Sequence, residues 1–552
     1  MSGGEPSTGG GEVAHEARHG PALAGAARAF GGVTLLSRIG GLLRDVLLVR
    51  VFGATATGSA FAAAFAIPNM FRRLFGEGAL SAAFVPEYAQ AVKADPALAD
   101  QLATWTVRRL ALATGLIMLL AQAATVAALL LAPPDPERAL SLRLIVVMLP
   151  FMPLVCVAAV LAGMLQVHGK FAASAGGALV LNAFIIAVGL WSVLTGTLGG
   201  ETTAYVLGAA TVLSGVTQVW WFARVLRPSV RWTRGTALAR EAARRMVGRF
   251  VPVMIGMGTL QLNGLVDTLI AMWPIWVGPT VLGVLYPLDE ASNSILSFTM
   301  RLYQFPLGVF GIAVATAALP LLSRHADEPA PFSRTLRRGL RLSLFIGLPA
   351  SLGLLLVRED LTYVMFAGGN AGFGEQVGRS AAVLMGFAPG VFAYALNHVY
   401  TRAFYACGDT RTPVRIAIGA MGLNLALNLT LIWHLREAGL AWATSAAAVA
   451  QCLVLGAVAE RRFGRRLDAS GAAHAVHDRA TVLAMARIVL ASLLMAGAVL
   501  AADWAWPPAD RWTPHAVRLG VLMTVGAGAY ALAAVLLRCD ELPALLRRSR
   551  PV

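Results

Sequence analysis

Apolar segments long enough to cross a lipid bilayer recur along most of this chain, and they constrain its fold more than any other feature. Of the 552 residues, 57% are hydrophobic and 13% are charged, whereas soluble domains carry about 25% charged residues. A helix needs about 20 apolar residues to span the hydrocarbon core. The composition therefore excludes a soluble enzyme, a disordered tail protein and a secreted disulfide scaffold, and it predicts an all-α polytopic membrane protein.

Hydropathy predicts fourteen membrane-spanning segments. Three of them, the first, second and eighth, are interrupted by charge, Pro or Gly, which favours positions along a water-filled cavity over positions in lipid. The expected segments are 28–52, 56–75, 104–132, 140–167, 171–196, 202–226, 246–274, 291–322, 338–357, 380–406, 412–434, 438–460, 481–503 and 514–538.

Arginine is unevenly distributed between the connections of these segments. The net charge is +16, which in a soluble protein would suggest nucleic acid, but the arginines cluster after even-numbered segments and are scarce after odd-numbered ones. Cytoplasmic loops carry such an excess. We therefore expect no nucleic-acid binding, cytoplasmic termini, a disordered cytoplasmic leader at 1–27 and a cytoplasmic tail at 539–552.

Two pairs of similar motifs indicate an internal repeat. Pro68 and Pro306 follow an apolar residue in similar surroundings and are 238 residues apart, and the Leu-Asn steps at Asn182 and Asn424 are 242 apart. Two six-helix lobes of like orientation would give nearly one offset, although chance similarity between Ala/Gly-rich helices is the alternative. The expected parts are a lobe at 28–226, an Arg-rich linker at 227–245, a lobe at 246–463, a cytoplasmic loop at 464–480 and a helix pair at 481–538.

Several charged residues lie inside otherwise apolar segments. They are Arg38, Arg44 and Asp45 in the first segment, Arg72 and Arg73 with Glu77 at the end of the second, and Arg301 in the eighth. An arginine at the bilayer centre costs about 2.5–3.5 kcal/mol on insertion scales and keeps its proton. Excess buried arginine predicts an anionic substrate, and guanidinium forks match phosphate oxygens. The alternatives are an internal Arg–Asp45 pair and snorkelling of Arg72 and Arg73.

The second half carries a different polar set, which comprises Asp267, Asn424, Asn428 and Thr444. Oxygen atoms of these types can hold a small hard cation such as Na⁺, and ordinary interhelical hydrogen bonding is the alternative. We expect no disulfide, because the four cysteines form no CxxC pair. Without an ATP-binding or catalytic motif, we expect a transporter driven by a gradient or by the membrane potential, with no enzymatic activity and no cofactor besides Na⁺.

Four sequence motifs are distinctive: TLLSRIGGLLRDVLLVRVFG, AFAIPNMFRRLFGEGALSAAFVPEY, MRLYQFPLGVFGIAVATAALP and RAFYACGDTRTPVRI. They resemble the MurJ (MviN) family, which are bacterial lipid II flippases of the multidrug/oligosaccharidyl-lipid/polysaccharide exporter superfamily. The resemblance runs from about residue 28 to residue 538. It implies fourteen helices in two six-helix lobes plus a C-terminal pair that forms a groove for the lipid tail.

The resemblance also implies residue roles. Arg38, Arg44, Arg72 and Arg301 fall on the arginines expected to bind the diphosphate, and Asp45 and Glu77 fall on acids near the cavity or its gate. Asp267, Asn424, Asn428 and Thr444 fall where some members hold Na⁺. The chain departs from the family at Ser59, Met300 and Gln304, where other members carry acids, and at Asn428, where some carry Asp. The cavity is therefore less acidic than in those members, and a Na⁺ site here would hold less negative charge.

The expected function is transfer of lipid II from the inner to the outer leaflet of the bacterial cytoplasmic (inner) membrane by alternating access, for peptidoglycan synthesis. The alternatives are export of another polyprenyl-linked glycan, cation-coupled drug efflux, and a scaffold for the cell-wall synthesis machinery without transport. We expect a monomer whose partner is lipid II in the membrane, with the cell-wall machinery as a further candidate partner.

Overall fold

The computed structural model describes residues 33, 36–75, 79–131, 135–196, 200–308, 312–367, 374–466, 472, 474–506 and 512–546. Within these residues, ten helices are long and apolar enough to cross a membrane. The predicted all-α polytopic fold is confirmed, and the number of fourteen spanning segments stays a prediction.

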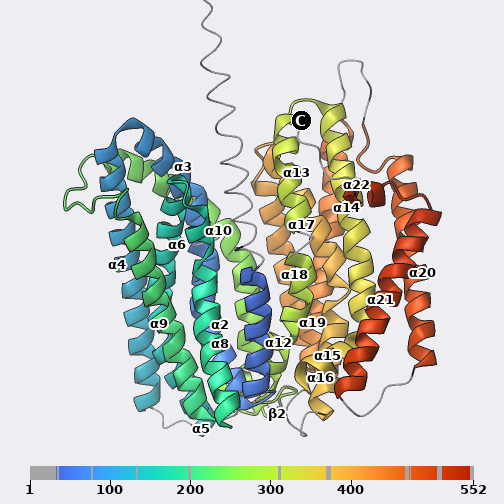
Figure 1. The fold of residues 1–552 in the computed structure, drawn as a ribbon, viewed down its shortest axis with the longest axis horizontal. Coiled ribbons are helices and arrows are strands. Elements are labelled where there is room, and N and C mark those ends of the chain that lie inside the picture. The colour runs from blue at the N-terminus through green and yellow to red at the C-terminus, as the bar shows by residue number, and fades with distance from the viewer. Residues whose placement is uncertain are drawn as a thin grey trace, which may run out of the picture. The chain divides into compact units, whose positions relative to one another are not determined.

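The first half of the chain is a succession of helices that opens with helical residues 36–52 (Figure 1). Within it, α6 packs against α3, α4 and α9, and α8 packs against α9. The remaining helices of this half are α2 (Ala56–Phe75), α3 (Ala79–Ala94), α4 (Pro96–Leu131), α5 (Pro136–Met148), α6 (Phe151–Val167), α7 (Phe171–Ala175), α8 (Gly177–Thr195) and α9 (Glu201–Leu226).

The second half continues with more helices and a small hairpin, and it ends in a helix pair, α20 and α21, that pack on each other (Figure 1). Its elements are α10 (Arg240–Ala271), α11 (Trp273–Trp276), β1 (Thr280–Val281), β2 (Val284–Leu285), α12 (Ser292–Pro306), α13 (Ile312–Arg324), α14 (Pro329–Leu356), α15 (Arg358–Phe366), α16 (Gly374–Phe387), α17 (Gly390–Ala406), α18 (Arg411–Leu435), α19 (Glu437–Ala459), the π-helix η2 (Glu460–Gly464), α20 (Arg479–Ala505), α21 (Trp512–Leu536) and α22 (Glu541–Leu546).

The internal repeat is visible in local geometry. Helices α6 and α17 both have 17 residues, and each follows a proline, Pro150 or Pro389, with nearly the same backbone angles. Each is followed by a left-handed glycine, Gly169 with φ 72° or Gly408 with φ 73°, a conformation that glycine adopts without a Cβ penalty. Helix neighbours repeat as well, since α6 contacts α3 and α9 just as α17 contacts α13 and α19.

Three predicted spans are each divided into two helices in the structure. The range 140–167 forms α5 and α6, 171–196 forms α7 and α8, and 380–406 falls on α16 and α17. Proline explains the first and third divisions, because it lacks the N–H that would continue a helix and fits a helix start. Helix α3 lies outside every predicted span.

A two-stranded hairpin between α11 and α12 was not predicted. Thr280 pairs with Leu285 and Val281 with Val284, and the turn residues Leu282 and Gly283 both have positive φ. This backbone twist suits a two-residue hairpin turn. The hairpin lengthens the connection between the first two helices of the second half.

The chain divides into two compact units, one of Met1–Val51 with Ala63–Gln261 and one of Phe52–Ala62 with Leu262–Val552. The short segment Phe52–Ala62 belongs to the second unit, where Ser59 Oγ accepts a hydrogen bond from the Ser294 amide at 2.9 Å. The lobe boundaries predicted at 226 and 246 stay a prediction.

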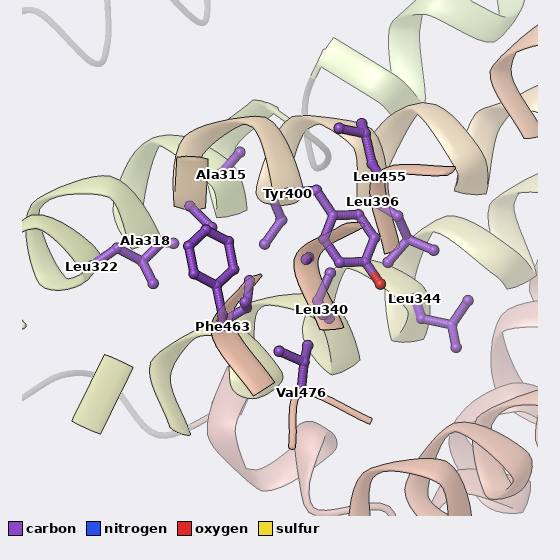
Figure 2. Packing of buried hydrophobic residues seen from close by; sticks show 14 of the residues in the cluster. Ala315, Ala318, Leu322, Leu340, Leu344, Leu396, Tyr400, Leu455, Phe463 and Val476 are labelled. Carbon is purple, nitrogen blue, oxygen red and sulfur yellow. The ribbon is translucent and has the colours of Figure 1, made fainter. Parts of the chain in front are cut away.

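The core of the second unit includes a residue from the segment that follows η2. Figure 2 shows Val476 beside Tyr400, Leu340 and Phe463, and Val476 is fully buried. His477 follows it, and its ring nitrogens lie 2.9 Å from Tyr400 Oη and from a Glu460 carboxylate oxygen. The segment is thereby fixed to α17 and η2.

Candidate functional site

The first-half cluster consists of Arg44, Asp45 and Asn182. Arg44 donates from Nε and Nη2 to Asp45 Oδ1 at 2.9 and 2.8 Å, and from Nη1 to Asn182 Oδ1 at 3.0 Å. The Arg44 and Asp45 side chains are only 14% and 17% exposed. The pair therefore joins the helical residues 36–52 to α8, as the internal-pair alternative anticipated.

Small residues allow these two helices to approach closely. A Cβ on Gly40 or Gly41 would lie 3.5 or 3.7 Å from Asn182 Nδ2. That nitrogen donates to the Ser37 carbonyl oxygen at 3.0 Å, so both polar groups of Asn182 are satisfied, as a buried amide requires. Asn182 is 5% exposed.

The other predicted first-half residues are not joined to this cluster by any hydrogen bond that the structure describes. Arg38 is exposed and, among the described residues, makes no hydrogen bond or ion pair, and Asp45 pairs with Arg44 instead of with Arg38. Arg72 is half-buried on α2 and donates from Nε to Asn69 Oδ1 at 2.9 Å. Glu77 lies outside the described residues.

The second-half cluster brings together the four residues predicted to hold Na⁺. Asn428 Nδ2 donates to Asp267 Oδ1 at 2.6 Å and to Asn424 Oδ1 at 3.0 Å, and Asn424 Nδ2 donates to Thr444 Oγ1 at 3.3 Å. Asn428 is fully buried, and among the described residues its Oδ1 has no hydrogen-bond partner. The set contains one carboxylate, and no cationic side chain takes part in these hydrogen bonds.

Two further predicted positions lie on or against α12. Arg301 is half-buried and lies five residues before Pro306. Ser59, where other family members carry an acid, is fully buried in the second unit, and its carbonyl oxygen accepts from Asn293 Nδ2 at 2.9 Å. The adjacent Gly58 is required by space, since a Cβ there would lie 2.7 Å from Ser294 Oγ.

An ion network at the start of α12 was missed from the sequence. Arg379 donates to Glu437 Oε1 at 2.6 Å and to Asp289 Oδ1 at 2.9 Å, and Arg436 donates to Asp289 Oδ2 at 2.7 Å. Burial raises the pKa of Asp289, but the hydrogen bond and charge of Arg379 outweigh burial and hold that pKa below its usual value. The partners are far apart in sequence, so no local pattern could have paired them.

A second missed network joins the C-terminal helix pair to α15. Asp360 is 2% exposed and accepts from Arg518 Nη1 at 2.6 Å, while His515 Nδ1 lies 2.6 Å from its other oxygen. Arg518 also donates to Asp503 and, at 2.7 Å, to the Trp506 carbonyl oxygen. In the sequence, the only signal of this network is that Asp360 lies next to the predicted span 338–357.

A family profile described as "Lipid II flippase MurJ" matches residues 48–513. The chain belongs to this family. A probable lipid II flippase MurJ of Vibrio cholerae serotype O1 is 31% identical over 92% of this chain and 94% of its own length. A lipid II flippase MurJ of Burkholderia cenocepacia is 29% identical over 77% of this chain and 81% of its own length.

Solved structures agree with the MurJ fold. A lipid II flippase MurJ in an inward closed conformation superposes with a TM-score of 0.72 at 20% identity, covering 94% of this chain and 99% of that one. An inward-facing multidrug resistance MATE transporter of the MOP superfamily gives a TM-score of 0.63 at 12% identity, covering 79% and 98%. The predicted family and superfamily fold are therefore confirmed, and the chain is a multi-pass membrane protein.

Proposed function

We propose that this chain flips lipid II, the undecaprenyl-diphosphate disaccharide-pentapeptide, from the inner to the outer leaflet of the bacterial cytoplasmic membrane by alternating access. Membership in the MurJ family carries the proposal, because named relatives of nearly the same length are lipid II flippases. Transport without a chemical reaction follows from the same assignment. Both termini are proposed to face the cytoplasm, in keeping with the arginine distribution.

The diphosphate is proposed to bind to guanidinium groups at membrane depth. Arg38 is exposed on the helical residues 36–52, and Arg72 and Arg301 are half-buried on α2 and α12. Each of these three helices is interrupted by charge or proline. A fork of N–H donors binds two phosphate oxygens at once. The isoprenoid tail stays in lipid, so the protein has to lower the barrier only for the polar head.

The test uses cells depleted of their own flippase and expressing this chain. Lipid II exposed on the outer surface is measured by its cleavage with an externally added lipid II-degrading enzyme. Loss of one charge-assisted hydrogen bond corresponds to about tenfold or more, so Arg38→Ala, Arg72→Ala and Arg301→Ala are each expected to lower exposure by that factor. Arg109→Ala, an exposed arginine on α4, is the matched control and should retain wild-type exposure.

Each result bears on a different part of the proposal. Absence of exposure from a well-expressed wild type would overturn lipid II flipping, and a parallel assay of a second polyprenyl-diphosphate glycan would then test the runner-up substrate. Exposure that survives all three arginine changes would overturn the site and leave the function. A scaffold without transport predicts the first result in these depleted cells, and normal exposure only in cells that keep their own flippase.

We further propose that the second-half cluster binds a small monovalent cation. The residues fit such a group: Asp267 supplies one negative charge, and Asn424, Asn428 and Thr444 supply neutral oxygens. The buried Asn428 Oδ1 has no hydrogen-bond partner in the part of the chain that the structure describes. Hard cations prefer oxygen ligands. A bound Na⁺ would neutralise Asp267 and connect α10, α18 and α19.

Thermal unfolding tests the cation site without substrate. Wild type in nanodiscs is compared in NaCl and in N-methyl-D-glucamine chloride at equal ionic strength. We expect NaCl to raise the melting temperature of wild type, since a ligand that binds only the folded state stabilises it, and to leave Asp267→Asn unchanged. Equal melting temperatures for wild type in both salts would contradict the site.

A further inference from the structure

The two polar clusters occupy corresponding places in the repeat. Each joins a carboxylate in the C-terminal half of the first helix of its half of the chain to an asparagine of the helix before α9 or α19. Asn182 and Asn424 are the repeat pair identified in the sequence. The clusters lie in different units, so their likeness is one of position within each half and implies no contact.

The carboxylates also correspond once the inserted hairpin is considered. Asp45 precedes Pro68 by 23 residues, and Asp267 precedes Pro306 by 39 residues. The excess matches the longer connection in the second half, which holds α11 and the hairpin. Sequence around the two acids is also alike, as GLLRDVLL compares with NGLVDTLI.

One position differs in charge. The residue before the acid is Arg44 in the first half and Val266 in the second. The guanidinium spans Asp45 and Asn182 by three hydrogen bonds, whereas the neutral amide of Asn428 spans Asp267 and Asn424. The first cluster therefore carries its own positive charge, and the second does not.

We propose that Arg44 is the tethered counter-ion of the first cluster, the counterpart of the cation proposed for the second, and that it positions residues 36–52 against α8 instead of binding substrate. The comparison with a cation rests on the proposed second-half site. Three of the five guanidinium N–H donors are committed to Asp45 and Asn182. Arg38, in contrast, is exposed and makes none of the described polar contacts.

The proposal predicts that removing the guanidinium opens a cation site in the first half. The experiment uses the full chain in nanodiscs with Asp267→Asn in every sample, so that the second cluster is silent. Added Arg44→Ala should make the melting temperature rise by about 2 °C or more in 100 mM NaCl relative to N-methyl-D-glucamine chloride. Two controls should melt at the same temperature in both salts. One carries Asp267→Asn alone, and the other carries Arg44→Ala and Asp45→Asn in addition to Asp267→Asn.

A transport measurement separates positioning from substrate binding and needs no second-half site. Arg44→Gln should lower lipid II exposure about tenfold, because it removes the guanidinium that donates two hydrogen bonds to the half-buried Asp45 carboxylate. Asp45→Asn added to the Arg44→Gln variant should restore exposure to within about threefold of wild type, since the charge imbalance is gone. A ligand of the diphosphate would not be restored by neutralising its neighbour.

The outcomes are decisive in both directions. Salt-specific stabilisation of Arg44→Ala together with recovery in the Arg44→Gln, Asp45→Asn variant supports the proposal. If Arg44→Ala does not fold, Arg44→Lys takes its place. This variant should fold, keep near wild-type exposure of lipid II and show no difference in melting temperature between the two salts. Loss of exposure in well-folded Arg44→Lys would overturn the positioning role. Absence of any sodium response in folded Arg44→Ala would overturn the counter-ion role. The unfolding readout needs no lipid II, so it stands apart from failure of the proposed flippase activity.

Discussion

The two halves of this chain repeat one succession of helices but distribute charge differently along it. In the first half a guanidinium bridges Asp45 and Asn182, and in the second an amide bridges Asp267 and Asn424. Both arrangements join the same pair of helices within their own half. The comparison teaches that the repeat conserves where polar groups meet, while the charge of the bridging group varies.

The same holds after the corresponding helices α6 and α17. Lys170 follows the left-handed Gly169, and its Nζ donates to the Val225 carbonyl oxygen at 2.6 Å. Asp409 follows the left-handed Gly408 and accepts from the Thr412 amide at 3.0 Å. One turn geometry thus serves a cation that reaches α9 and an anion that caps α18.

The C-terminal helix pair packs on the second half, where α20 contacts α14 and α21 contacts α15, and breaking its buried network should have the largest effect. Arg518→Ala leaves the Asp360 carboxylate buried without its main partner, which costs about 3–5 kcal/mol. We expect a large fall in the melting temperature measured by tryptophan fluorescence in nanodiscs. Arg479→Ala, an exposed arginine at the start of α20, is the control, and a loss of equal size there would refute the role of the network.

The two cluster acids provide the next test, because the halves predict unequal results. Asp45→Asn leaves Arg44 without its ion pair and should destabilise the protein by about 2–3 kcal/mol, reduced from the fully buried value by partial exposure. Asp267→Asn removes a charge that no side chain pairs in the described hydrogen bonds, so in sodium-free buffer its effect should stay within about 0.5 kcal/mol. Equal losses from both variants would remove the distinction between the clusters.

The connections that precede the corresponding helices α9 and α19 give a smaller contrast. A single residue, Arg436, separates α18 from α19, and a Cβ on Gly439 would lie 2.6 Å from the Leu431 carbonyl. Gly439→Ala should therefore cost about 2 kcal/mol through backbone displacement. Gly200, before α9, has open space at its Cβ position, and Gly200→Ala should change stability by less than about 0.5 kcal/mol. Thermal unfolding tests this contrast by comparing the melting temperature of each variant with that of the wild type.

Much of the fold could be predicted because bilayer spanning imposes long apolar runs, and the repeat could be predicted from Pro68 and Pro306. The divisions at Pro150 and Pro389 could not be inferred from hydropathy, since the apolar run continues across each proline. The hairpin at Thr280–Leu285 is too short to leave a periodic pattern. Local apolarity identifies a span, but the break within it depends on backbone geometry.

The site was partly predictable for the same reason. Asp267, Asn424, Asn428 and Thr444 were grouped as isolated polar residues in apolar helices, and the structure joins them by hydrogen bonds. Networks such as Arg379 with Glu437 could not be predicted, because charges near span ends normally face water. Their pairing depends on how distant helices meet.

The smallest effect concerns the helix cap that distinguishes Asp409 from Lys170. Burial raises the pKa of Asp409, but hydrogen bonds from Thr412 and the charge of Arg462 outweigh burial and hold that pKa below its usual value. A lowered native pKa means that the stabilisation is present above the unfolded value of about 3.9 and is lost as the pH falls through the native pKa. Asp409→Asn keeps an oxygen acceptor but removes the negative charge near the start of α18, which should cost about 0.5 kcal/mol at neutral pH, with the difference from wild type vanishing in the acid range below that native value. Melting temperatures measured from neutral to acid pH check this, and a difference that persists at the lowest pH would show that the carboxylate charge is not what caps α18.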